Sequence, residues 1–66
     1  MQIQLNGTPV VIDDSPTIAE LLVRQGYADR RVAVEINHAI VPRGAHATHR
    51  VVDGDTIEIV TAFGGG

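Results

Sequence analysis

The residues best suited to chemistry are the glycines that close the sequence, which ends Thr61-Ala62-Phe63-Gly64-Gly65-Gly66. Glycine has no Cβ atom, so a glycine tail can thread a narrow channel and adopt backbone angles closed to other residues. Three extended residues span about 10 Å, enough to carry a terminal carboxylate into a partner enzyme. We therefore expect the Gly66 carboxylate to be the reactive group, with Gly64 and Gly65 as threading residues. The alternative is a frayed terminus or the remnant of a linker.

A carboxylate becomes electrophilic only when its oxygen becomes a good leaving group, which adenylation by ATP would achieve. The side chains offer less chemistry than this tail. His46 and His49 could share one side of a helical turn, and His38 is a third imidazole, but no further ligand has the spacing of a zinc site. Asp53 and Asp55 flank a glycine, where aspartate commonly accepts hydrogen bonds from the backbone. We predict no metal site and no catalytic side chain, so an enzyme that acts alone is the weakest candidate.

Length and composition narrow the function further. A chain of 66 residues forms one domain with a thin core, so no deep substrate cavity is expected. The net charge is −3 and the five arginines are scattered along the sequence, a pattern that disfavours binding to nucleic acid. No apolar stretch approaches the ~20 residues that cross a bilayer, and no signal peptide is evident. We expect a soluble, cytoplasmic protein that binds no membrane and is a monomer when free.

The strand pattern begins with a β-hairpin. Residues 1–5 alternate apolar and polar side chains, Asn6-Gly7 is a strong turn signal, and residues 10–12 form the returning strand. Residues 43–50 are polar and irregular. Further strands are expected at residues 32–36, 39–41 and 56–60, the first two joined by a turn at Asn37-His38 and the last preceded by a turn at Asp53-Gly54-Asp55.

One short helix follows the hairpin. It begins either at Ser15, with Pro16 in the first helical position, or at Thr17, which forms a capping box with Glu20. Ile18, Leu21 and Leu22 then share one face, and Gly26 is suited to end the helix. A single amphipathic helix must pack across one face of the sheet that the strands complete. The expected fold class is therefore a two-layer α+β arrangement, with the strand order left open.

An ordered set of features extends over essentially the whole chain, and none of them is diagnostic alone. They are the hairpin, the helix Thr17-x-x-Glu20-Leu21-Leu22, the segment Val34-x-Ile36-Asn37-x-x-Ile40-Val41-Pro42-Arg43, the turn Asp53-Gly54-Asp55 and the ending Gly65-Gly66. In this ordered set the chain resembles the ThiS family of thiamine sulfur carriers.

The resemblance implies a ubiquitin-like β-grasp fold, with a mixed sheet of four to five strands and one main helix on one face. It implies a domain over residues 1–63 and a flexible glycine tail over residues 64–66. It further implies that an E1-like, ThiF-type enzyme adenylates the Gly66 carboxylate, and that a sulfur-transfer protein helps convert it to a thiocarboxylate. A ThiG-type thiazole synthase then uses the sulfur to build the thiamine thiazole ring.

Four residues are candidates for docking these partners. Val60 and Ala62 fall on the face of the last strand opposite its isoleucines and form a small outward apolar patch. Phe63 either packs against the sheet edge or is exposed to anchor a partner. Arg43 is either an ordinary solvated arginine or the partner of a carboxylate.

Three other functions use a similar fold. The small subunit of molybdopterin synthase shares the Gly-Gly ending, but its family is usually longer. A ubiquitin-like modifier would join Gly66 to lysine side chains of other proteins. A non-covalent β-grasp binding module would need no free terminal carboxylate, so deleting Gly65 and Gly66 separates it from a carrier.

Overall fold

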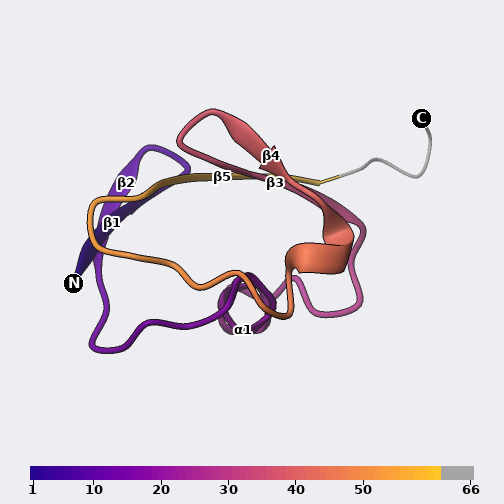
Figure 1. Cartoon of the computed structure of the whole chain (residues 1–66), viewed down its shortest axis with the longest axis horizontal. Coiled ribbons are helices and arrows are strands. Elements are labelled where there is room, and N and C mark those ends of the chain that lie inside the picture. The colour runs from indigo at the N-terminus through magenta and orange to yellow at the C-terminus, as the bar shows by residue number, and fades with distance from the viewer. Residues whose placement is uncertain (62–66) are drawn as a thin grey trace.

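The computed structural model describes residues 1–61 as a five-stranded sheet with one helix beneath it (Figure 1). In chain order the elements are β1 (Gln2–Leu5), β2 (Thr8–Val11), α1 (Ile18–Arg24), β3 (Val32–Ile36), β4 (Ala39–Val41), the 3-10 turn η1 (Arg43–Ala45) and β5 (Thr56–Thr61). The expected two-layer α+β class is confirmed. No helix of this described part is long and apolar enough to span a bilayer.

The sheet is mixed, with strand order β2-β1-β5-β3-β4. β5 lies at its centre, parallel to β1 and antiparallel to β3, while the two hairpins form its flanks. The last strand in the chain is therefore held on both sides. A strand paired along both edges is a rigid base for any segment that follows it.

One aliphatic core fills the space between α1 and the sheet. β1, β3 and β5 turn alternate side chains inward, and α1 contributes the three residues that share its inner face. The buried apolar residues are Ile3, Leu5, Ile18, Leu21, Leu22, Val32, Val34, Ile36, Val41, Val51, Ile57 and Ile59. The opposite face of the sheet is left uncovered by this part of the chain.

A capping box fixes the start of α1, and a glycine in the left-handed conformation follows its end. Thr17 is the N-cap: its Oγ1 accepts a hydrogen bond from the Glu20 amide at 3.1 Å, and Glu20 Oε1 accepts from the Thr17 amide at 2.8 Å. Ser15, the alternative cap, instead donates to the Val51 carbonyl at 2.5 Å. Gly26 follows the helix with φ of +84°, which confirms its expected left-handed conformation.

Two strand bounds and one loop differ from what the sequence predicted. The second strand begins at Thr8 rather than residue 10, because the two-residue turn at Asn6-Gly7 pairs Leu5 directly with Thr8. The last strand extends to Thr61, since β3 continues to pair with it. Residues 43–50 were expected to be irregular and polar, yet they contain η1 and bury His46.

Candidate functional site

The end of β5 is the point after which the predicted functional tail follows in the sequence. Thr61, the last described residue, is the register partner of Val32 at the start of β3. The predicted site residues Ala62, Phe63, Gly64, Gly65 and Gly66 lie outside the described residues, as does the expected domain boundary after residue 63. Their roles stay predictions.

Val60 lies on the uncovered face of the sheet, as its position in the strand predicted. Its side chain is 53% exposed, whereas Ile57 and Ile59 are buried on the opposite face. Its register partner Ala33 is also exposed. The predicted outward patch is therefore present at Val60, and Ala62 cannot be placed on it.

Ile40 is exposed on the same uncovered face, although it is not among the predicted site residues. Its side chain is 72% exposed, and its neighbour Val41 is buried. Ile40 pairs with Glu35, which in turn pairs with Glu58 of β5. Period-two alternation along residues 39–41 would have indicated this exposure. The uncovered face thus combines apolar and acidic side chains.

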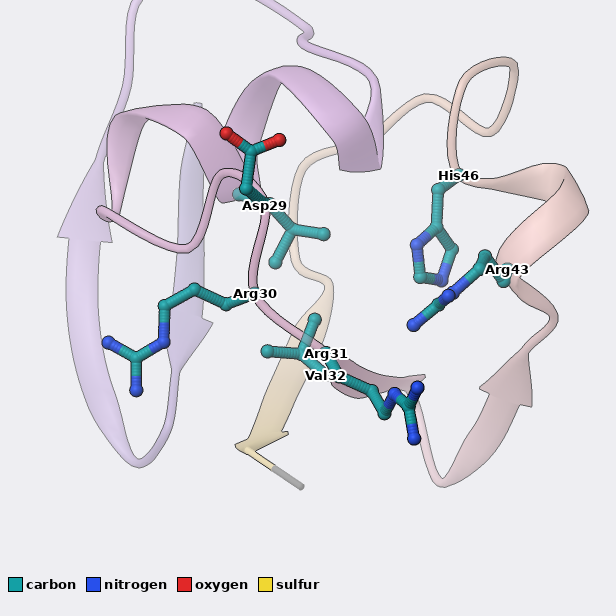
Figure 2. Close-up of a pocket in the computed structure, with 7 residues that line it drawn as sticks. Asp29, Arg30, Arg31, Val32, Arg43 and His46 are labelled. Carbon is teal, nitrogen blue, oxygen red and sulfur yellow. The ribbon is translucent and has the colours of Figure 1, made fainter. Parts of the chain in front are cut away.

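Arg43 lines a recess of about 340 Å³ at the end of the sheet near Thr61 (Figure 2). The recess is bordered by Leu22, Asp29, Arg30, Arg31, Val32, Arg43 and His46. Among residues 1–61 the sole ion pair joins Arg24 to Asp14, so Arg43 has no carboxylate partner there. Charged side chains dominate this border, unlike the apolar lining of most small-molecule pockets.

The three histidines and the turn aspartates lie in several different turns. His38 and His49 are exposed, whereas His46 is buried, with Nε2 3.0 Å from the Val41 carbonyl oxygen. Asp53 Oδ1 accepts from the Gln2 amide at 2.7 Å. No cluster of three or more possible metal ligands occurs within the described chain.

Asp55 closes its turn from the inside of the protein. Its Oδ2 accepts from the Val52 amide at 2.9 Å, and its Oδ1 accepts from Asn37 Nδ2 at 3.1 Å. The backbone-bonding role expected of the turn aspartates is confirmed for both Asp53 and Asp55. Their carboxylates hold the entry to β5 in place and are occupied by these bonds.

Two carboxylates with lowered pKa values stabilise α1, Glu20 in its first turn and Asp14 through Arg24 in its last turn. Hydrogen bonds from the Thr17 amide and hydroxyl lower the pKa of Glu20. A hydrogen bond from the Arg24 guanidinium lowers the pKa of Asp14, and the attraction between the charges adds to this. These groups act in the architecture of the helix layer, on the other side of the molecule from the uncovered sheet face.

A family model, a similar sequence and a solved structure all point to the same family. The ThiS family model matches residues 3–66. The sulfur carrier protein ThiS of Escherichia coli is 36% identical over 66 residues, the whole of both chains. The crystal structure of the thiamine biosynthesis protein ThiS from Geobacter metallireducens is 35% identical and superposes over the whole of both chains with a TM-score of 0.85. The expected ubiquitin-like β-grasp fold is confirmed.

Two longer relatives carry a similar region. Proteins named thiazole synthase from Magnetococcus marinus and Paramagnetospirillum magneticum are 41% and 42% identical over 66 residues. The alignment takes in all of this chain but 20% of each relative. The chain thus spans about a fifth of the length of these two proteins.

Proposed function

The chain belongs to the ThiS family of sulfur carriers in thiamine biosynthesis, and from that membership we propose that it carries sulfur on the carboxylate of Gly66. The carboxylate oxygen attacks ATP and forms an acyl-adenylate with loss of pyrophosphate. A sulfur nucleophile then displaces AMP, which takes the former carboxylate oxygen with it. The observation that carries this proposal is that the family match runs through Gly66, to the end of the glycine tail.

The position of the last described residue supports a carrier role. Thr61 ends the central strand, and β5 is paired with strands on both sides. Five extended residues beyond it would reach about 17 Å. A rigid body with such a reach can deliver a reactive group into an enzyme while its own side chains stay outside the reaction. The protein is then a recycled co-substrate in the cytoplasm and holds no cofactor, since ATP belongs to the activating enzyme.

Three enzymes would act on the tail. An E1-like, ThiF-type enzyme adenylates it, a sulfur-transfer protein supplies sulfur, and a ThiG-type thiazole synthase receives that sulfur for the thiazole ring. The thiazole synthase assignment is supported by the two relatives that bear this name and include a region similar to the whole chain. We propose that Val60, Ala62, Phe63 and Arg43 contact these enzymes, with Gly64 and Gly65 in the channel.

The test is the intact mass of the protein purified from cells that contain the activating and sulfur-transfer enzymes, compared with cells that lack them. Replacement of one oxygen by sulfur, localised to Gly66 by fragmentation, is the expected result. Two variants sharpen it: deletion of Gly65 and Gly66, and addition of one alanine after Gly66. Both should keep the fold and abolish the mass change, because each moves the carboxylate.

An unmodified mass beside demonstrably active enzymes would overturn the proposal. A bond between Gly66 and a lysine of another protein would identify a modifier instead. Retention of partner binding and function after the two-glycine deletion would identify a non-covalent binding module.

A further inference from the structure

Three of the five arginines gather at one end of the molecule. The other two are held by the body: Arg24 pairs with Asp14, and Arg50 donates to a backbone carbonyl at 2.7 Å. The remaining three line the recess, namely Arg30, Arg31 and Arg43. Positive charge is thus concentrated at one end of a protein whose net charge is −3.

Within the recess, two of these guanidinium groups lie on the same side. Figure 2 shows Arg31 and Arg43 on the His46 side of Val32, with Arg30 on the other side. Arg30 lies over the Tyr27 ring, 5.9 Å from its centroid. Asp29, the acidic residue of the recess, is directed away from both Arg31 and Arg43 (Figure 2). Neither of these two arginines forms an ion pair within residues 1–61.

The backbone that carries Arg43 is fixed by His46. This side chain is only 8% exposed, and its Nε2 lies 3.0 Å from the Val41 carbonyl oxygen. Because a carbonyl only accepts, Nε2 carries the hydrogen. The His46 carbonyl accepts in turn from the Ala19 amide at 2.8 Å, which links η1 to the helix layer. Arg43 is therefore presented from a rigid segment, which lowers the entropy lost when it binds.

The recess also lies where the functional tail begins. Val32 borders it and is the register partner of Thr61. Any enzyme that takes up the segment after Thr61 must cover this end of the sheet. Guanidinium groups suit carboxylates, which they bind through two parallel hydrogen bonds.

We propose that Arg31 and Arg43 dock aspartate or glutamate side chains of the thiazole synthase, at the rim of the opening that receives the tail. This inference rests on the proposed function and adds to it a recognition site outside the glycines. A protein carboxylate fits better than nucleic acid, because the described residues that border the recess include none of the aromatic platforms on which single strands stack. The docking aligns the body so that the tail enters the enzyme.

The test compares Arg31→Gln, Arg43→Gln and the double variant with Arg30→Gln. The last is the matched control, since it removes one charge from the same recess on the side occupied by Tyr27. Calorimetry with purified thiazole synthase should show the double variant binding about tenfold more weakly, with the control close to wild type. Wild-type affinity should also fall more steeply with added salt than that of the double variant. Unchanged circular dichroism and melting temperature confirm that each variant folds.

Equal affinities for the double variant and the Arg30→Gln control would overturn the inference while leaving sulfur transfer by the wild type intact. Binding of inorganic phosphate at the two arginines, with unchanged affinity for thiazole synthase in the double variant, would overturn it in favour of a small-anion site. A wild-type chain that neither binds thiazole synthase nor acquires sulfur would overturn the proposed function as well.

Discussion

Asn6 and Asn37 hold the central strand β5 from opposite sides. Each lies in the two-residue turn of a hairpin with positive φ, 49° and 52° respectively. Asn6 Oδ1 accepts from the Ile59 amide at 2.7 Å, and Asn37 Oδ1 accepts from the Thr56 amide at 2.9 Å. Because β5 lies between β1 and β3, the turn side chains of both hairpins fix the strand that carries the tail.

Replacing Asn6 by glycine should therefore destabilise the protein. Glycine tolerates the positive φ, so the main change is the loss of an acceptor for the Ile59 amide, which costs about 1–2 kcal/mol of unfolding free energy. Urea denaturation measures the difference. Asn6→Asp keeps an acceptor oxygen at the same place and serves as the control. Equal stability of the two variants would show that this hydrogen bond contributes little.

Replacing His38 in the turn of the second hairpin by glycine should stabilise the protein. His38 has φ of 70° in the turn after Asn37, whereas the first hairpin has glycine at the same position. The left-handed conformation costs a non-glycine residue roughly 1–2 kcal/mol, partly offset by the greater flexibility of glycine in the unfolded chain. We expect His38→Gly to raise the free energy of unfolding by about 0.5–1 kcal/mol, measured in urea. His38→Ala should show no such gain, and a gain of equal size would refute strain as the cause.

Like charges face each other on the uncovered side of the sheet, where Glu35 is the register partner of Glu58. Directly opposed like charges are destabilising, and a cross-strand pair contributes about 0.2–1 kcal/mol. Glu58→Arg should therefore stabilise the protein by about 0.5–1 kcal/mol, and Glu58→Gln by less. The melting temperatures at low and high salt provide the measurement, because screening should shrink both gains. Gains that are independent of salt would point to a cause other than charge.

Local patterns in the sequence were enough to place the elements. The Asn6-Gly7 turn, the Thr17 and Glu20 capping box and the alternation along residues 32–36 and 56–60 each act through neighbours in the chain. The position of β5 beside β1 depends on pairing between segments about 50 residues apart. No local signal encodes that pairing, so the strand order could not be predicted.

The same distinction applies to the candidate site. The exposure of Val60 follows from its place in an alternating strand. Arg31 and Arg43 are separated in sequence, so the arginines look scattered along the chain. The two come together only where the start of β3 approaches η1. The burial of His46 was not predicted, because it depends on the 3-10 turn η1. This turn directs the His46 side chain to the Val41 carbonyl.

Acid should weaken the contacts at both ends of α1. The pKa of Glu20 is lowered by the Thr17 hydrogen bonds and that of Asp14 by the Arg24 hydrogen bond. A folded-state pKa below the unfolded value stabilises the protein above the unfolded pKa, and this contribution is lost as pH falls through the folded pKa. The ordinary pKa values of Glu20 and Asp14 are 4.5 and 3.8, so this stability should be lost below these pH values.

Urea midpoints near pH 7 and near pH 3 measure this loss. Glu20→Gln keeps an acceptor for the Thr17 amide but carries no charge, so its midpoint should change less between the two pH values than that of wild type. All other residues are the same in both proteins, so the difference between the two pH dependences reports the contribution of Glu20. A Glu20→Gln variant with the full wild-type pH dependence would show that Glu20 does not contribute.

The uncovered sheet face should matter to activation rather than to stability. Val60 is 53% exposed there, beside the segment that leads into the tail, and Val23 is 62% exposed on α1 in the other layer. Val60→Glu and Val23→Glu therefore introduce the same charge at similarly exposed valines on opposite sides of the molecule.

If the E1-like enzyme packs against the sheet face, Val60→Glu places a charge inside that interface and should lower kcat/KM for ATP-dependent adenylation about tenfold or more. Val23→Glu should leave kcat/KM nearly unchanged. Pyrophosphate release measures both rates, and equal rates would mean that the enzyme holds the carrier elsewhere.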